Sequence, residues 1–290
     1  SQLCFSCSAA GWMFEANLKE TAMIDDPDLD EPDSEEPDFD SLDFEEPAFV
    51  PSALDETSKL EPGVVELWMA WVDSEEDTFT RLEATLSEDE LERAAEKDGD
   101  QLRRFVTTRG ILRELLASYA GVLPTELAFE YSEYGKPKAF TASGDGPYFN
   151  VSHSGDLALF AFSSDQEVGV DVEQVRARAR LDEIAEKYFS PAEAEMVAGL
   201  MDEERDSLFA SYWTRKEALY KAIGTGIANR PGTVDLSGMA VDGAEVSCPS
   251  DGGEDESWYV RDIEVEDGFR AALCCRSRPA ELHCKDAFYD

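Results

Sequence analysis

One predicted helix, Glu203–Ala222, carries ionisable side chains within its apolar and aromatic face. At the helical period of 3.6 residues, Trp213, Glu217 and Lys221 share a face, and Lys216 lies beside it. A solvent-facing amphipathic helix would keep its charges on the opposite side. Charges beside apolar side chains are partly desolvated, which makes them either costly or useful in binding and catalysis. We therefore expect this helix to contribute an acid and two lysines to a ligand site.

A second pattern that could do chemistry is a pair of acids in an apolar strand. In the predicted strand Val168–Glu173, Asp171 and Glu173 project from one face because strand side chains alternate. Neighbouring carboxylates repel each other unless a cation lies between them, and Mg²⁺ prefers such oxygen ligands. The chain has 65 acids among 290 residues, so this spacing alone is common by chance. The apolar setting, with Glu217 as a third oxygen donor, favours a metal site over a solvated strand end.

Five motifs in a fixed order make the sequence resemble the Sfp-type 4′-phosphopantetheinyl transferases of the holo-[acyl-carrier-protein] synthase superfamily. The resemblance covers the chain from about Val64 to the C-terminus. The order and spacing of the motifs are more specific than any one of them. The motifs are Gly135-Lys136-Pro137, Asn150-Val151-Ser152-His153-Ser154, Gly169-Val170-Asp171-Val172-Glu173, Phe189-Ser190-Pro191-Ala192-Glu193 and Trp213-Thr214-Arg215-Lys216-Glu217-Ala218-Leu219-Tyr220-Lys221.

This resemblance implies a reaction and roles for the residues already named. Enzymes of the family transfer the phosphopantetheine arm of coenzyme A to a serine of an acyl or peptidyl carrier protein, and release adenosine 3′,5′-bisphosphate. Asp171, Glu173 and Glu217 would hold Mg²⁺, or Mn²⁺, at the pyrophosphate. Glu217 would help to deprotonate the serine, and Lys221 would stabilise the leaving phosphate. The implied catalytic residues are thus Asp171, Glu217 and Lys221.

The resemblance also implies contacts to coenzyme A. Ser152 and His153 would meet the 3′-phosphate or the pyrophosphate, Lys136 would lie near the adenine and the 3′-phosphate, and Lys216 would assist at the phosphates as a point charge. A basic helix upstream would add two arginines. The full set of candidate contacts is Arg104, Arg109, Lys136, Ser152, His153, Lys216 and Lys221.

Two of these assignments have structural alternatives. His153 is one of only two histidines, and a lone histidine is often a structural residue, although the Ser-His-Ser turn setting favours a phosphate contact. The arginines of the basic helix are as consistent with a solvated face as with a ligand site. Those arginines are Arg103, Arg104, Arg109 and Arg113.

No rival chemistry has a motif of similar strength. The sequence has no Gly-x-x-x-x-Gly-Lys-Ser/Thr phosphate loop, and two histidines argue against a histidine-rich zinc site. Cys4 and Cys7 have a metal or redox spacing but no matching second pair. Cys274 and Cys275 are adjacent in a predicted strand and should point to opposite faces. Six cysteines in a chain of this length indicate reduced thiols, and we expect a cytoplasmic protein.

Composition narrows the class of partner. No stretch has the apolar length of a membrane span or the pattern of a secretory signal, and we expect neither a membrane nor a nucleic acid as partner. Residues 1–60 contain 17 acids and 2 bases, and the rest of the chain still contains 48 acids and 23 bases. This acidity is consistent either with adaptation to a high-salt cytoplasm or simply with an acidic, soluble protein.

The predicted organisation is an acidic leader followed by an α+β fold. Residues 1–62, with their proline-acid repeats, read as disordered. Helices followed by several strands, twice over, indicate two α+β lobes, 63–174 and 175–290, and the resemblance implies a pseudo-twofold monomer with its active site between them. The predicted strands are Val64–Val72, Leu127–Tyr131, Tyr148–Val151, Ala158–Phe162, Val168–Glu173, Val234–Leu236, Trp258–Ile263 and Phe269–Cys275. The predicted helices are Glu88–Lys97, Gln101–Ala120, Leu181–Lys187, Pro191–Leu200 and Glu203–Ala222.

Two alternative functions stay open. A non-catalytic module that binds coenzyme A or a carrier protein would keep Lys136 and His153 but lose the metal site. All three presumed metal carboxylates are present, which favours an enzyme. A metal-dependent phosphoryl-transfer enzyme with another nucleotide substrate would need only the acids at 171 and 173, and the series of motifs makes it the weaker alternative.

Overall fold

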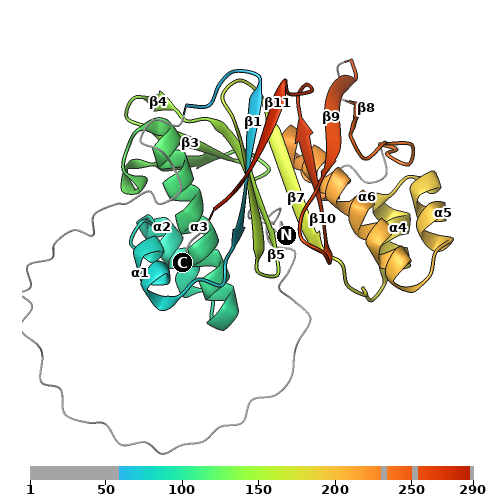
Figure 1. Cartoon of the computed structure of the whole chain (residues 1–290), viewed down its shortest axis with the longest axis horizontal. Helices are drawn as coiled ribbons and strands as arrows, with labels where there is room; N and C mark the ends of the chain where they lie inside the picture. The colour runs from blue at the N-terminus through green and yellow to red at the C-terminus, as the bar shows by residue number, and fades with distance from the viewer. Residues whose placement is uncertain (1–58, 230–233, 250–253, 288–290) are drawn as a thin grey trace, which may run out of the picture. The chain divides into compact units, whose positions relative to one another are not determined.

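Two four-stranded β-sheets form the centre of the folded part of the chain (Figure 1). The computed structural model describes residues 59–229, 234–249 and 254–287, so the predicted disordered leader lies almost entirely outside the described residues. The strand order is β11-β1-β6-β5 in the first sheet and β7-β10-β9-β8 in the second, and a smaller sheet has the order β2-β3-β4. Only β1 and β11 pair in parallel among the pairings of these sheets.

The first sheet consists of β1 (Val64–Trp71), β5 (Tyr148–Ser154), β6 (Leu157–Ser163) and β11 (Glu281–Asp286). The second consists of β7 (Val168–Gln174), β8 (Ala244–Cys248), β9 (Glu256–Ile263) and β10 (Phe269–Cys275). The small sheet consists of β2 (Ala128–Tyr131), β3 (Pro137–Thr141) and β4 (Gly144–Asp145). The helices are α1 (Glu76–Glu83), α2 (Glu88–Ala95), α3 (Gly99–Ala120), α4 (Leu181–Tyr188), α5 (Pro191–Ala198) and α6 (Asp202–Ile223).

The sheets and helices form four layers. α3 covers the outer face of the first sheet, and its Ile111 and Leu115 share a buried cluster with Phe160 of β6. The inner faces of the two sheets pack against each other through alternating apolar residues such as Leu159 of β6 and Val170 of β7. α6 covers the outer face of the second sheet. The acids of β7 therefore lie where the second sheet meets both α6 and the first sheet.

A glycine lets α6 approach β7 closely. A Cβ atom at Gly169 would lie 2.1 Å from the carbonyl oxygen of Ala218 and 2.4 Å from the backbone nitrogen of Ala222, which is far inside van der Waals contact. Only glycine therefore permits this packing. The close approach brings the last turns of α6, which carry Glu217 and Lys221, onto the strand that carries Asp171.

Most of the predicted elements are confirmed, with ends that shift by a few residues. The predicted strand Val234–Leu236 is wrong, because these residues are irregular. Side chains, and not a neighbouring strand, satisfy the backbone of this segment: Lys216 donates to the carbonyl of Val234, and the N–H of Leu236 donates to Glu193. Elements that the sequence analysis missed are α1, β3, β4, β8 and β11.

The mixed α+β class is confirmed, whereas the pseudo-twofold pair of lobes stays a prediction. β7, on the N-terminal side of the predicted boundary at 174, belongs to the second sheet, and β11, from the other end of the chain, belongs to the first. Cys274 and Cys275 do point into different clusters, and the cysteines of the described ranges are free thiols. None of the helices in those ranges combines the length and hydropathy that a membrane crossing needs.

Candidate active site

Side chains join the edge strands β5 and β7, which belong to different sheets. Polar residues at alternate positions of β5 point to one side and accept hydrogen bonds from alternate backbone N–H groups of β7. The acceptors are Asn150 Oδ1, Ser152 Oγ and Ser154 Oγ, and the donors are the N–H groups of Val170, Val172 and Gln174, at 2.9, 3.3 and 3.0 Å. We call this contact the seam. It satisfies the outer edge of β7 without a further strand.

Asp171 lies on the seam and is 4% exposed. Its Oδ1 accepts hydrogen bonds from Ser152 Oγ at 2.8 Å and from Lys221 Nζ at 2.6 Å. Its Oδ2 is buried and has no hydrogen-bond partner. Burial raises the pKa of Asp171, although Lys221 and Ser152 oppose the rise. One oxygen of this carboxylate is thus satisfied, and the other is left for a further cation or donor.

Lys221 and Glu217 reach the seam from α6, one helical turn apart. Lys221 Nζ also donates to Ser152 Oγ at 3.0 Å and to the Val170 carbonyl at 3.3 Å. Burial raises the pKa of Glu217 to about 7, and the negative charge of Asp171 adds to the rise while Lys221 opposes it. Near neutral pH Glu217 is therefore poised to take up or release a proton.

Glu173 projects from β7 on the same side as Asp171. Its Oε2 accepts hydrogen bonds from Arg178 at 2.6 Å and from Ser154 Oγ at 3.3 Å. The charge of Glu173 also contributes to the raised pKa of Glu217. The three acids that the sequence predicts as metal ligands thus interact electrostatically in one part of the molecule.

The carboxylates supply the oxygen donors that Mg²⁺ prefers, but they do not form a closed cage. Within residues 59–229, 234–249 and 254–287, no group of three or more histidine, cysteine or acidic side chains is arranged to hold a metal ion. The unpartnered Asp171 Oδ2 and the raised pKa of Glu217 nevertheless mark a surplus of negative charge that a cation would relieve. The residues therefore fit a cation that takes further ligands from water or phosphate oxygens.

Lys136 lies beside the C-terminal end of α6 rather than among the carboxylates. Its Nζ forms an ion pair with Glu167 and donates to the Ala222 carbonyl at 2.8 Å. Burial lowers the pKa of Lys136, and Glu167 opposes this effect. The residue thus ties the turn before β3 to α6 and to the start of β7.

The structure does not bring Lys216 to the carboxylates. This lysine is fully buried; its Nζ lies 2.9 Å from Glu193 Oε2 and donates to the Val234 carbonyl at 2.6 Å. Glu193 also forms the capping box of α5 with Ser190. These contacts give Lys216 a structural position, and its assistance at the phosphates stays a prediction that no contact here supports.

His153 and Ser152, predicted as a pair, point to opposite faces of β5. Ser152 is buried at the seam, whereas His153 is exposed and lies across from Ala158 of β6. Arg104 reaches the turn that follows β5, where it contacts Asp156 at 2.8 Å. His153 and Arg104 therefore belong to the α3 side of the first sheet, apart from the carboxylates.

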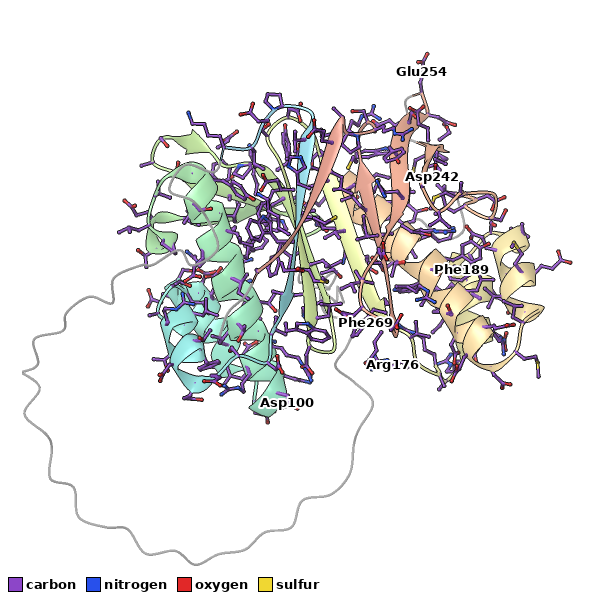
Figure 2. The ribbon with its side chains drawn as sticks, viewed as in Figure 1. Asp100, Arg176, Phe189, Asp242, Glu254 and Phe269 are labelled. Atoms are coloured by element: carbon purple, nitrogen blue, oxygen red, sulfur yellow. The ribbon has the colours of Figure 1, made fainter. Side chains whose placement is uncertain are left out.

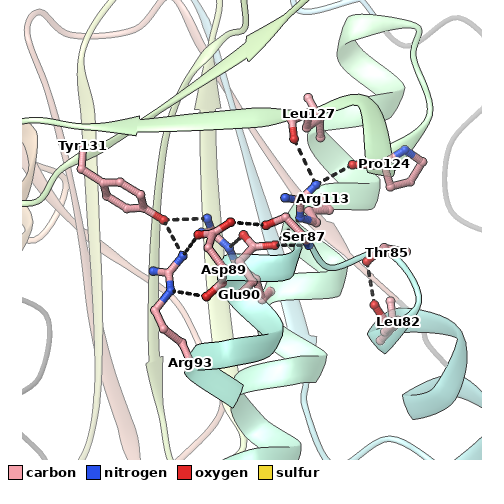
Figure 3. Close-up of polar contacts among 11 residues, drawn as sticks. Leu82, Thr85, Ser87, Asp89, Glu90, Arg93, Arg113, Pro124, Leu127 and Tyr131 are labelled. Carbon is pink, nitrogen blue, oxygen red and sulfur yellow. Dashed lines mark hydrogen bonds and ion pairs between the residues drawn. The ribbon is translucent and has the colours of Figure 1, made fainter. Parts of the chain in front are cut away.

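Arg109 of α3 contacts Glu90 of α2 and Tyr131 of β2, and so belongs to a network that links these three elements. Figure 3 shows Glu90, Arg113 and Tyr131 of this network. Glu90 is fully buried and accepts hydrogen bonds from both Arg109 and Arg113. Burial alone would raise the pKa of Glu90, but the two arginines and the Ser87 N–H outweigh it and hold the pKa below its usual range. Because Arg113 is only 1% exposed, a solvated face is the wrong interpretation for it.

The sequence analysis did not name four residues of these clusters: Glu90, Arg93, Tyr131 and Arg178. The Tyr131 hydroxyl oxygen accepts hydrogen bonds from Arg93 and Arg109, each at 3.1 Å (Figure 3). Two guanidinium groups thus converge on one oxygen at the surface. The Ser87-x-x-Glu90 capping box was a readable signal for α2, and it places Arg93 one turn after Asp89.

Comparison with known proteins places these residues in a family. Residues 167–274, which include Asp171, Glu173, Glu217 and Lys221, match the model of the 4′-phosphopantetheinyl transferase superfamily. The chain is 42% identical over 168 residues to the 4′-phosphopantetheinyl transferase HetI of Nostoc sp., an alignment that covers 57% of this chain and 70% of HetI.

Two further relatives agree with this match. The 4′-phosphopantetheinyl transferase Sfp of Bacillus subtilis is 28% identical over 174 residues, covering 57% of this chain and 70% of Sfp. The 4′-phosphopantetheinyl transferase AcpT of Salmonella typhimurium is 38% identical over 112 residues, covering 39% of this chain and 56% of AcpT. The chain belongs to the 4′-phosphopantetheinyl transferase superfamily.

Proposed function

We propose that the chain transfers the 4′-phosphopantetheine group of coenzyme A to a serine of an acyl or peptidyl carrier protein. The observation that carries this proposal is the cluster at the seam, where Lys221 and Ser152 hold one oxygen of Asp171, the other oxygen has no partner, and the charge of Asp171 helps to raise the pKa of Glu217. Membership of the transferase superfamily supplies the reaction type.

In the proposed reaction the serine oxygen forms a bond to the phosphorus that carries pantetheine. The bond from that phosphorus to adenosine 3′,5′-bisphosphate breaks, and the serine proton passes to Glu217 directly or through water. Without a cation the pKa of Glu217 is about 7; a bound cation would lower it, so Glu217 would be ionised and able to accept the proton near neutral pH. Lys221, whose Nζ donates to Asp171, would offset the charge that develops on the leaving phosphate.

Asp171, Glu173 and Glu217 would hold Mg²⁺, for which Mn²⁺ could substitute. The ion would neutralise charge on the pyrophosphate while the phosphoryl bond breaks. Ser152 would keep Asp171 oriented, because its hydroxyl donates to Oδ1 while its oxygen accepts from the Val172 N–H and from Lys221. Ser152 thus orients a metal ligand, and Glu217 accepts the proton of the serine hydroxyl.

Arg93 of α2 and Arg109 of α3 would bind the anionic end of coenzyme A. Arg93 and Arg109 converge on Tyr131, and a phosphate would find two guanidinium groups already directed at one position. Lys136, Ser152, His153 and Arg104 remain proposed contacts to the adenine, the 3′-phosphate and the pyrophosphate. We expect the protein to act as a monomer, with no nucleic-acid partner.

Intact mass spectrometry of a carrier protein tests the proposal. An apo acyl or peptidyl carrier protein incubated with coenzyme A, Mg²⁺ and this enzyme should gain the mass of one phosphopantetheine arm, and a chelator should abolish the gain. The test should be run at low and at molar salt. Binding of coenzyme A without any mass gain would favour the non-catalytic binding module, and the absence of both would contradict the proposal.

We also propose that the acidic composition reflects adaptation to high salt. Repulsion among the 65 acids, against 25 bases, destabilises the compact chain at low ionic strength, and salt screens this repulsion. The melting temperature should therefore rise between dilute and molar KCl. A melting temperature that does not change with KCl would contradict the adaptation and leave an ordinary acidic protein.

A further inference from the structure

Arg178 contacts one of the three proposed metal ligands. It lies in the segment between β7 and α4, and its Nη2 is 2.6 Å from Glu173 Oε2. Both side chains are mostly shielded from solvent, at 21% and 16% exposed. The guanidinium carbon also lies 5.6 Å from the centre of the Phe209 ring of α6. Arg178 is therefore placed by two contacts, and one of them is with the site.

The segment that carries Arg178 is otherwise turned outward. Arg176, Ala177, Ala179 and Arg180 are exposed, whereas Arg178 is half-buried. Figure 2 shows Arg176 close to Phe269, at the end of the second sheet where the chain leaves β7. A side chain held by a connecting segment can move away from its partner at lower cost than one fixed within a helix or strand.

Asp171 and Glu173 each contact a basic side chain through one carboxylate oxygen, but Lys221 comes from a long helix and Arg178 from a connecting segment. Lys221, from the long helix α6, donates to Oδ1 of Asp171, and Oδ2 has no hydrogen-bond partner, so Oδ2 can bind a cation while the lysine stays. On Glu173, Arg178 and Ser154 contact the same oxygen, Oε2. A divalent cation that approaches this oxygen meets the positively charged guanidinium of Arg178.

We propose that Arg178 is an internal counter-ion that competes with the divalent cation for Glu173, and that metal loading moves its guanidinium off this carboxylate. The inference rests on the proposed function, because it takes Glu173 as a metal ligand. In the metal-free protein Arg178 offsets the repulsion among Asp171, Glu173 and Glu217. When a cation is bound, the positive charges of the ion and of Arg178 repel each other.

Metal affinity measured without turnover tests this competition. The free Mn²⁺ concentration is followed by electron paramagnetic resonance as Mn²⁺ is added to the full chain with saturating coenzyme A and no carrier protein. Arg178→Gln should bind Mn²⁺ about tenfold more tightly than the wild type, as expected for loss of one charged hydrogen-bonding competitor. Arg178→Lys keeps the charge and should lie between the two.

Two controls separate this effect from general electrostatics. Arg180→Gln removes the same charge two residues away, where the side chain is exposed and paired with Glu183, and it should leave the Mn²⁺ affinity within about twofold. In a Glu173→Gln background, Arg178→Gln should no longer change the affinity, because the group for which it competes is gone.

Each other outcome overturns the proposal in a distinct way. Unchanged or weaker Mn²⁺ binding in Arg178→Gln, with wild-type binding intact, would overturn the competition alone. An equal gain in Arg180→Gln would show a general charge effect and overturn it as well. If the wild type and all the variants failed to bind Mn²⁺ beside coenzyme A, the metal role in the proposed function would fail together with the counter-ion.

Discussion

Two buried clusters of charge in this molecule have opposite characters. At the seam, Asp171 and Glu217 both have raised pKa values, and one carboxylate oxygen has no partner. In the network of α2 and α3, Glu90 is saturated by Arg109 and Arg113, and its pKa is lowered. The first cluster has fewer basic than acidic side chains, and the second has more basic than acidic ones. The comparison teaches that burial of an acid marks a site only where the acid is left incompletely paired.

This difference suits a ligand that carries both a cation-bound pyrophosphate and a separate phosphate. A pyrophosphate and its cation would be met at the seam, and a further phosphate would be met where Arg93 joins Arg109. The negative chain as a whole does not prevent this, because local fields depend on the groups that line a site. Substitutions at the seam should therefore affect catalysis, whereas substitutions in the network of α2 and α3 should affect stability or the binding of coenzyme A.

The largest effect is expected at the seam. Glu217→Gln removes the proposed base, so kcat should fall by about 10² to 10⁴, while the fold survives because the amide keeps the volume and removes a charge that burial disfavours. Turnover is measured by mass spectrometry of the carrier. The matched control is Glu204→Gln, an exposed position on the same helix, which should behave as wild type. Wild-type turnover in Glu217→Gln would rule out the assigned base.

The next largest effect is expected in the arginine network, and it concerns stability. Glu90→Gln leaves the buried charge of Arg113 uncompensated, which should lower the free energy of unfolding by about 3–5 kcal/mol. Urea unfolding measures the loss. Asp89→Asn, at the exposed neighbouring partner of Arg93, should change it by about 0.5 kcal/mol or less. Equal effects of the two changes would mean that the network does not stabilise the fold.

The pH dependence of stability should distinguish the wild type from Glu217→Gln. Folding raises the pKa of Glu217 from 4.5 to about 7, so the folded protein binds more protons in this interval. The stability that proton binding by Glu217 contributes to the folded state is therefore fully present below pH 4.5. It is lost as the pH rises through 7, by at most about 1.4 kcal/mol for each pH unit. Thermal unfolding of both proteins across this range measures it. Parallel curves would contradict the raised pKa.

A smaller effect is expected where the two guanidinium groups converge. Arg93→Met should raise the KM for coenzyme A about tenfold and leave kcat nearly unchanged, because it removes a binding contact away from the reacting bond. The difference from wild type should shrink with 3′-dephospho-coenzyme A if the contact is to the 3′-phosphate. Arg103→Met, which loses a surface pairing with Glu76, is the control. A fall in kcat at constant KM would contradict the assignment.

The sequence predicted the parts of this structure that depend on local patterns. The alternation in Val168–Glu173 and the helical spacing of Glu217 and Lys221 identified the acids and lysine that meet at the seam. Their meeting depends on Gly169, whose close contact with α6 cannot be read from spacing. Lys216 was predicted to contact the phosphates because it is next to Glu217 in the sequence. One residue along a helix turns a side chain by about 100°, and here this turn directs Lys216 into the core.

Contacts between distant segments account for the rest. Arg93 meets Tyr131 across 38 positions, and Val234–Leu236 is fixed by side chains of α5 and α6 rather than by a strand ladder. β11 pairs with β1 from the opposite end of the chain, which no short pattern encodes. Arg178 is close to Glu173 in sequence, yet only the turn after β7 directs it back. These features depend on tertiary packing and not on propensity.

The most direct test of the account is the position of Mn²⁺ in crystals grown with coenzyme A. An anomalous difference map reports the ion independently of any activity. The account predicts a peak in contact with Asp171, at the oxygen that has no partner here, and shared with Glu173 and Glu217 beside the pyrophosphate. A peak elsewhere, or a pyrophosphate bound away from the seam, would contradict it.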